Sequence, residues 1–389
     1  MILLLSLSLI VLSYLCYKID KSIFAPCVLC SGIWGIILFL YVILDPPFYP
    51  LREKFITSLL IWIVGFLISA YLIGFSLNIA KREFIPINVK IWRILLFLSI
   101  LSCVITSYNA IEVAITTPEH FFLALRSINT GLDENLEVRT AGILPYFNSA
   151  LLILYIVELI TLEHGKKMLY LLLFLNVFFA FITMAKTQFT LIFVVTVVVL
   201  YQQNRIKLKQ LIIPSCFLLF FFVILQTIRM LDGDDFETSS FFNLYLFSSI
   251  VAFDNLPNDI NYDGSMVFRF FYALLNTLGV KVNVNETILD FIQIADTGIT
   301  TNTYTIMYPF YADFGYWGVL IFSLFYGCFY SYIYQLSKVS NFGLVIYSIL
   351  VAYLILSFIG DFLFTNLSLF IQYSFYSAII FLKTSKKYD

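Results

Sequence analysis

Long runs of apolar residues, interrupted by short polar segments, follow one another along almost the whole chain. A helix needs about 20 apolar residues, within a range of about 17–25, to cross the hydrocarbon core of a membrane. On this criterion the pattern predicts eleven membrane-spanning helices. They cover residues 2–17, 23–44, 55–79, 94–110, 141–161, 168–185, 187–202, 211–228, 309–336, 341–359 and 362–382. We therefore expect an all-α polytopic membrane protein, with residues 1–389 forming a single integral membrane domain.

The basic residues predict the orientation of these helices, because cytoplasmic loops carry an excess of Lys and Arg. With the N terminus outside and the C terminus inside, 15 of the 23 basic residues fall in short cytoplasmic connections. A single helix over residues 168–202 would split the basic clusters between both faces, so we predict a helical hairpin there. In this orientation two outer loops are long, residues 111–140 and residues 229–308. The material outside the membrane is therefore expected on the outer face.

The composition excludes several other classes of protein. Hydrophobic residues make up 61% and charged residues 12%, against about 45–50% and about 25% in soluble globular proteins. The net charge of −1 offers no basic surface, so we expect no nucleic-acid partner. No phosphate-binding loop of the G-x-x-x-x-G-K-[ST] type occurs, which argues against an ATP-driven pump. Cys27 and Cys30 form a C-x-x-C without a second pair or a His, so we expect no metal and no cofactor.

The two long outer loops contain short apolar and amphipathic segments. Residues 119–129 have helical spacing in the first loop. In the second loop, residues 241–253 are too short to span and predict a re-entrant or interfacial segment. Residues 265–279 have an apolar helix pattern, and residues 285–298 are amphipathic. We expect short amphipathic helices in these loops that pack on the membrane surface.

Basic residues in or beside these segments are the candidates for phosphate binding. Arg126 and Arg269 each lie inside an apolar stretch, where a charge is costly unless it is paired or faces water. A guanidinium group binds phosphate oxygens through two parallel hydrogen bonds. The alternative is that each side chain reaches the lipid headgroups or pairs with an Asp of its own loop. Arg139, Lys186 and Arg229 stand at predicted span ends, where they fit either phosphate binding or simple interfacial anchoring.

Residues 300–322 read TTNTYTIMYPFYADFGYWGVLIF and combine polar with aromatic side chains. Asn and Asp side chains hydrogen-bond sugar hydroxyls, and aromatic faces stack on sugar rings. The candidates for glycan binding or acid–base chemistry here are Asn302, Tyr304, Tyr308, Tyr311 and Asp313. The alternative is a helix-capping Asp beside the belt of Tyr and Trp that marks any membrane interface.

This stretch resembles a motif of a known family. The string TNTYT–x–YPFYADFGYWGVL is similar to the "TN-Y-T … YY-DFG--G" stretch of the O-antigen polymerases and related oligosaccharide repeat-unit polymerases. The predicted layout also agrees, with many spans, two large outer loops, an Arg in the first loop and a basic turn between two close helices. Lys186 stands at that turn, where other members often carry Arg. Eleven spans with an outside N terminus depart from a layout with both ends inside.

The resemblance implies a glycosyltransferase of the bacterial cytoplasmic (inner) membrane with an active site facing the periplasm. Such an enzyme transfers a growing chain from undecaprenyl pyrophosphate to the non-reducing end of a new lipid-linked repeat unit. The implied partners are the undecaprenyl-pyrophosphate-linked oligosaccharide, membrane lipid, a chain-length regulator and the flippase of the same pathway. No nucleotide is needed, because the pyrophosphate bond drives the reaction.

The resemblance also suggests roles for the candidate residues. Arg126 and Arg269 would stabilise the developing pyrophosphate, and Arg229, Lys186 and Arg139 would assist substrate binding. Asp313 would act as the base or orient the sugar hydroxyl. The acceptor glycan would contact Asn302, Tyr304, Tyr308 and Tyr311.

Two other functions remain open from the sequence. An O-antigen ligase uses the same donor and differs only in its acceptor, so the Arg positions do not separate it from a polymerase. A flippase or secondary transporter of the lipid-linked unit should show internal repeats and charges near the middle of the membrane. The chain shows no such repeat, and Glu158, the clearest acid within a predicted span, lies near a span end.

Overall fold

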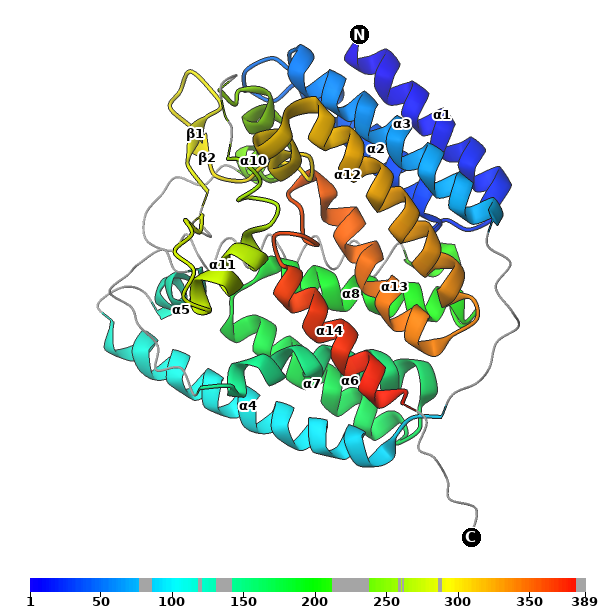
Figure 1. Ribbon diagram of the computed structural model, residues 1–389, viewed down its shortest axis with the longest axis vertical. Coiled ribbons are helices and arrows are strands. Elements are labelled where there is room, and N and C mark those ends of the chain that lie inside the picture. Colours follow the sequence, from blue (N-terminus) through cyan, green and yellow to red (C-terminus); the bar gives the residue numbers. More distant parts are fainter. Residues whose placement is uncertain are drawn as a thin grey trace. The chain divides into compact units, whose positions relative to one another are not determined.

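In the computed structural model of the protein, the described residues are mostly helical, with one short pair of strands (Figure 1). It describes residues 1–76, 86–117, 121–130, 142–211, 238–257, 260, 262–285 and 289–382. The contacts divide the chain into two compact units. The first contains Met1–Ala80, Glu237–Leu336 and Tyr353–Ser368, and the second contains Lys81–Phe236, Ser337–Ala352 and Leu369–Asp389.

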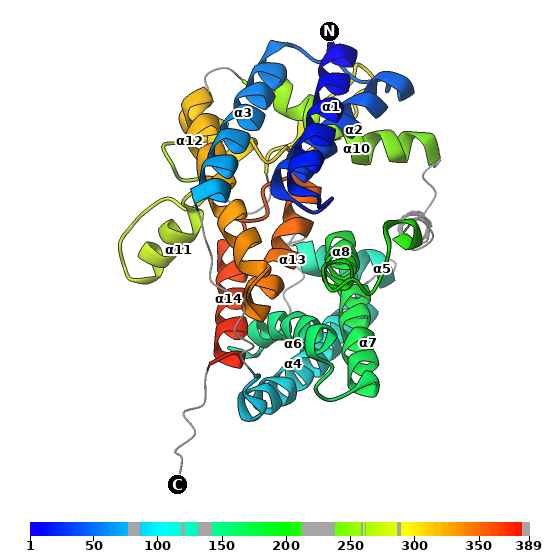
Figure 2. The ribbon, with the colours of Figure 1, turned by 90° about the vertical axis from the view of Figure 1, so that its right-hand side faces the viewer.

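The first unit is built around long apolar helices and carries the motif over residues 300–322. Its helices are α1 (Ile2–Asp20), α2 (Pro26–Leu44), α3 (Glu53–Ser76), α10 (Thr238–Asp254), α11 (Arg269–Thr277) and most of α12 (Tyr308–Ser337). Figures 1 and 2 show α3 and α12 side by side. Small residues permit this approach: a Cβ added at Gly65 would collide with Ser323, and one at Gly327 would collide with the Phe66 carbonyl. The two helices are therefore packed at nearly backbone contact.

The second unit surrounds one deeply buried helix. Its helices are α4 (Val89–Thr116), α5 (Phe121–Thr130), α6 (Asn148–Thr161), α7 (Lys166–Ile182), α8 (Lys186–Gln202), most of α13 (Asn341–Ile355) and α14 (Leu367–Ile380). Short 3-10 turns occupy Leu144–Phe147 and Leu208–Leu211 in this unit, and Leu356–Phe358 in the first. Every residue of α6 from Ser149 to Ile160 is buried. This helix is apolar on all sides, as expected for the centre of a bundle.

The helices confirm a membrane protein but not the number of spans. Among the described residues, seven helices are long and apolar enough to cross a membrane. They are Ile2–Asp20, Pro26–Leu44, Glu53–Ser76, Val89–Thr116, Leu144–Thr161, Tyr308–Ser337 and Asn341–Phe358. The predicted hairpin over residues 168–202 is present as α7 and α8, although each helix is shorter than a typical span. The predicted span 211–228 lies outside the described residues.

The last predicted span, residues 362–382, begins later than expected, at Leu367. The carboxylate of Asp361 explains the delay. It accepts the backbone N–H groups of Leu363 at 3.1 Å and of Phe364 and Thr365 at 3.0 Å, so it closes a turn that competes with helix. The Tyr326 hydroxyl donates a further hydrogen bond to this carboxylate. Asp361 therefore fixes the connection to α14 against the middle of α12.

The second long loop is only partly helical where it is described. The apolar segment 241–253 forms α10, whose later residues, from Phe247 to Phe253, are buried. The amphipathic segment 285–298 does not form one of the expected short helices over its described part. Instead β1 (Ile292–Gln293) pairs antiparallel with β2 (Thr300–Thr301). Gly298 lies in the intervening turn with φ +83°, a conformation that favours glycine and closes a hairpin.

Within the second unit, the connections that carry the predicted cytoplasmic charges lie at one end. The Arg205 guanidinium donates to the Leu159 carbonyl at 2.9 Å, and the Asn88 N–H donates to the Ile380 carbonyl at 2.7 Å. At the other end of α7, the Asn129 amide donates to the Ile182 carbonyl at 3.2 Å, which attaches α5 there. The two ends of the α7–α8 hairpin therefore carry the connections that its predicted topology assigns to them. Which end faces the cytoplasm remains a prediction.

Candidate functional site

The motif segment begins at β2, runs through a non-helical stretch and enters α12 at Tyr308. Gly315 breaks this helix, with φ +60° and ψ −149°. An L side chain rarely adopts that backbone conformation, so glycine is needed there. The break separates a short first part, which carries Tyr311 and Asp313, from the long apolar part that follows. The D-F-G sequence is thus the point where the membrane helix changes direction.

Asp313 connects this helix to the segment before α11. Its side chain is only 5% exposed. One carboxylate oxygen accepts the Met266 N–H at 3.2 Å, and the other accepts the Val267 N–H at 2.7 Å. A buried charge requires such hydrogen bonds. The acid of the motif therefore holds the backbone two residues before Arg269, which is the first residue of α11.

Arg269 is half-buried and takes part in a small polar network. Its Nε donates to the Asn285 carbonyl at 2.8 Å, and the Asn285 amide donates to the Ser265 hydroxyl at 2.7 Å. Burial lowers the pKa of the Arg269 guanidinium. An Arg side chain nevertheless stays protonated in proteins, so this position keeps its positive charge. The structure thus brings Arg269 and Asp313 into one connected region of the first unit.

Tyr304 and Tyr308, two of the four candidates for binding the acceptor glycan, are packed against each other. The rings of Tyr304 and Tyr308 stack with centroids 4.2 Å apart, and both side chains are buried. The Tyr304 hydroxyl donates to the Asp290 carbonyl at 2.8 Å, and burial raises the pKa of Tyr304 to about 12. Their ring faces are covered by protein in this conformation, which leaves Asn302 and Tyr311 as the partly exposed members of the set.

Tyr311 lies beside a pocket lined by charged residues, here called the charged pocket, that the sequence did not indicate. The ring of Tyr311 is 5.8 Å from the Lys54 ammonium, measured to its centroid. Lys54 lines a pocket of about 550 Å³ at the start of α3. The lining residues are Arg52, Glu53, Lys54, Asp254, Asn255, Leu256 and Pro257. Arg52 and Lys54 are among the basic residues outside the predicted cytoplasmic connections. Because they stand at a span boundary, where interfacial anchors are common, the sequence did not distinguish them from such anchors.

The pocket is held together by contacts between residues far apart in the sequence. The Asp254 carboxylate accepts the backbone N–H of Phe55 at 2.8 Å and also that of Arg52. These bonds satisfy donors at the N terminus of α3, where a negative charge is favourable. The Lys54 ammonium donates to the Leu256 carbonyl. The end of α10 is thereby fixed to the beginning of α3.

The second unit contains the other described candidates. Arg126 is half-buried in α5, beside the fully buried Leu125. Lys186 is the first residue of α8 and directly follows the α7–α8 turn, whose α7 end contacts α5 through Asn129. Arg126 and Lys186 therefore belong to one end of this unit. Arg139 and Arg229 lie outside the described residues.

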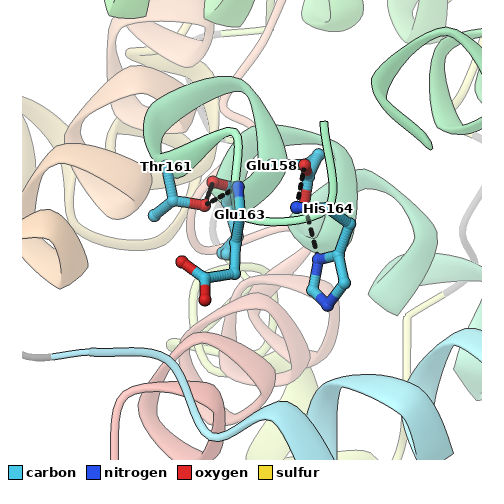
Figure 3. A network of polar contacts seen from close by, with 5 residues as sticks. Glu158, Thr161, Glu163 and His164 are labelled. Carbon is cyan, nitrogen blue, oxygen red and sulfur yellow. Dashed lines mark hydrogen bonds and ion pairs between the residues drawn. The ribbon is translucent and has the colours of Figure 1, made fainter. Parts of the chain in front are cut away.

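A hydrogen-bonded pair of Glu158 and His164 lies at the opposite end of α7 (Figure 3). The carboxylate of Glu158, which is 0% exposed, accepts the backbone N–H of His164 at 2.8 Å and contacts its Nδ1 at 2.9 Å. The His164 ring stacks on Trp92 with centroids 3.8 Å apart. Glu158 thus stabilises the α6–α7 turn through His164. This agrees with its predicted place near the end of a span rather than at the middle of one. Within the described ranges, no cluster of three or more His, Cys, Asp or Glu side chains is placed to hold a metal.

Comparisons with known proteins give one finding. A family model described as "Putative O-antigen polymerase" matches residues 31–371, which is well over half of the chain. Neither the curated proteins nor the solved structures contain a match. The matched range includes the motif, α11, the charged pocket and the described parts of both long loops.

Proposed function

The chain belongs to the O-antigen polymerase family, and from this premise we propose that it polymerises lipid-linked oligosaccharide repeat units. The product is O-antigen or a related surface polysaccharide. The donor is a growing chain on undecaprenyl pyrophosphate, and the acceptor is the non-reducing end of a new repeat unit. The proposed site of action is the periplasmic face of the cytoplasmic membrane, which agrees with a membrane protein whose long loops are predicted on the outer side.

The proposed reaction forms one bond and breaks one bond. A sugar hydroxyl of the new unit attacks the anomeric carbon of the growing chain, and the bond from that carbon to the lipid pyrophosphate breaks. The hydroxyl proton passes to a basic side chain or to water at the site, and the lipid keeps the pyrophosphate with its added negative charge. Catalysis therefore needs positive charge at the leaving group and a proton acceptor near the hydroxyl. Neither requirement involves a nucleotide.

The observation that supports this proposal most directly is the connection between Asp313 and the start of α11. The family-like D-F-G motif holds, through the N–H groups of Met266 and Val267, the segment that positions Arg269. A guanidinium held on a fixed backbone stabilises a developing phosphate charge with little reorganisation. We assign Arg269 to the leaving pyrophosphate and propose the same role for Arg126. This geometry supports Asp313 as the positioning residue for Arg269.

The remaining candidates have supporting roles in the proposal. Lys186, Arg139 and Arg229 assist in binding the anionic donor. Asn302 and Tyr311, which are partly exposed, contact the acceptor sugars. The buried Tyr304 and Tyr308 shape the segment that presents these two side chains. In the cell, the protein works with the flippase that supplies the unit and with a chain-length regulator.

The decisive experiment uses the purified protein in lipid nanodiscs with an undecaprenyl-pyrophosphate-linked repeat unit and no nucleotide. We expect a ladder of glycan lengths that remain on the lipid carrier. Transfer only to an added lipid A core, without a ladder, would identify a ligase. Movement of the lipid-linked unit across a proteoliposome membrane without glycan extension would identify a flippase. The polymerase proposal fails in either case.

A further inference from the structure

The charged pocket at the start of α3 is a candidate site for an anionic headgroup. Arg52 and Lys54 place two positive charges on its wall, and the pocket is open to solvent. The Asp254 carboxylate is buried, accepts backbone N–H groups of α3 and also attracts the Lys54 ammonium electrostatically. Glu53 is exposed at the rim and is the remaining negative side chain. The pocket thus offers the Arg52 guanidinium and the Lys54 ammonium to a phosphate, with Glu53 and the buried Asp254 as the opposing acids.

A separate apolar groove lies on the same helix. Its volume is about 440 Å³, and it is lined almost entirely by apolar atoms. The lining residues come from α3 and α12 and are Leu60, Ile61, Val64, Tyr316, Trp317 and Leu320. Both helices are candidate membrane spans, and Val64 and Trp317 are exposed within them. The groove therefore opens toward the lipid acyl region.

The pocket and the groove are connected by two tyrosines. The Lys54 ammonium lies 5.8 Å from the centroid of the Tyr311 ring, and that ring contacts Tyr316 edge-on at 5.2 Å. Tyr316 lines the groove. Along α3, Leu60 follows Lys54 by six residues, which is about 9 Å at about 1.5 Å per residue. The pocket and the groove therefore lie about 9 Å apart along α3, with the contacting rings of Tyr311 and Tyr316 between them.

We propose that the pocket and the groove together bind the phosphate head and the proximal chain of a long isoprenoid phosphate. The phosphate lies between Arg52 and Lys54, and the chain runs past Tyr311 and Tyr316 into the groove. A single groove suits a ligand with one chain, whereas a glycerophospholipid would leave its second chain outside. The inference rests on the proposed function for the identity of the lipid, and it names a place on the first unit where the lipid carrier is held.

The test measures binding and not polymerisation. The purified full chain in detergent is incubated with undecaprenyl phosphate, with undecaprenol, with dioleoylphosphatidylglycerol or with inorganic phosphate, and bound lipid is quantified by native mass spectrometry. We expect retention of undecaprenyl phosphate at least about tenfold above that of undecaprenol and of the phospholipid. Equal retention of undecaprenol would overturn the headgroup site. Equal retention of the phospholipid would show general annular lipid and would also overturn the proposal, as would binding of inorganic phosphate as tight as that of the lipid.

Matched variants locate the site. The Arg52→Gln and Lys54→Gln variants should each lower retention of undecaprenyl phosphate about tenfold, while Glu53→Gln should increase it, because it removes the opposing charge. Val64→Trp fills the groove and should reduce retention. Leu72→Trp, which alters an exposed apolar residue further along α3, serves as its control. Unchanged retention in the Arg52, Lys54 and Val64 variants would refute the assignment.

The outcome can be separated from that of the proposed function. Binding that depends on Arg52 and Lys54, in a protein that forms no glycan ladder, would support the lipid site and refute the polymerase. If a glycan ladder forms while lipid binding is unchanged in the Arg52 and Lys54 variants, the polymerase is supported and the lipid site is refuted. Thermal unfolding of each variant confirms that the chain is folded.

Discussion

The carboxylate of Asp313 accepts a hydrogen bond from the backbone N–H of Val267 at 2.7 Å. This bond joins the kinked start of α12 to the segment that leads directly into α11. Asp313 belongs to the motif and Val267 to the middle of the second long loop. Asp313 therefore helps to position Arg269, because a shift of its carboxylate would displace the backbone that precedes Arg269.

The Asp313→Asn variant should retain part of the activity. An amide keeps one acceptor oxygen, so one of the two backbone hydrogen bonds survives and the other is lost. We expect kcat to fall about tenfold, with the apparent KM for the donor rising as well, because Arg269 is less well positioned. Steady-state kinetics with the lipid-linked donor measure both parameters. A fall in kcat of about 1000-fold or more in Asp313→Asn, with an unchanged KM and a residual activity whose pH profile lacks the acid limb, would instead identify a catalytic base.

The Arg269→Lys variant should lose activity by about 100-fold, even though it keeps the charge. An ammonium group lacks the planar fork of guanidinium and lacks the Nε that donates to the Asn285 carbonyl. The measurement is the rate of glycan-ladder formation at saturating donor. Lys281→Ala, a change at an exposed basic residue of the same loop, is the control and should be neutral. A mild effect of Arg269→Lys would reduce the residue to an interfacial anchor.

The Tyr304→Phe variant should lower the free energy of unfolding by about 1 kcal/mol, because it removes the hydrogen bond to the Asp290 carbonyl. It should also change the pH dependence of stability. Burial raises the pKa of Tyr304 to about 12, so the folded protein disfavours the phenolate. The contribution is fully present below the pKa of an unfolded Tyr, about 10, and is lost as the pH rises toward about 12.

Thermal unfolding between about pH 8 and about pH 11 measures both effects of Tyr304→Phe. The wild type should lose stability above about pH 10 more steeply than the variant. Tyr170→Phe, which alters an exposed tyrosine in the second unit, should show neither effect. Identical pH slopes for the wild type and Tyr304→Phe would contradict the assignment.

The Gly327→Ala variant should destabilise the packing of α3 on α12. The added Cβ would collide with the Phe66 carbonyl, which is backbone and cannot move aside. Overpacking of this kind costs about 1–3 kcal/mol, so the melting temperature should fall by several degrees. Gly74→Ala is the matched control, because its Cβ would meet the Ser331 hydroxyl at an acceptable 3.4 Å. Equal melting temperatures for the two variants would show that the close approach of the helices is not required.

The sequence by itself determined the membrane class, most of the long helices and the family motif. These features depend on local properties: the length of an apolar run, its helical period and the order of residues in one short stretch. The helices over α5 and α11 were predicted for the same reason. The predictions were wrong where side chains compete with the backbone, as at Asp361, and where a turn glycine favours a hairpin, as at Gly298.

Only the tertiary structure decided which chemical groups meet. Asp313 reaches Val267, and Asp254 reaches Phe55, across long separations in sequence that no periodicity reveals. Packing also distinguished Tyr304, whose ring is covered, from Tyr311, which adjoins Lys54. An apolar run in the sequence predicts each helix separately. A site, in contrast, arises from contacts between helices, and those contacts form only when the chain is folded.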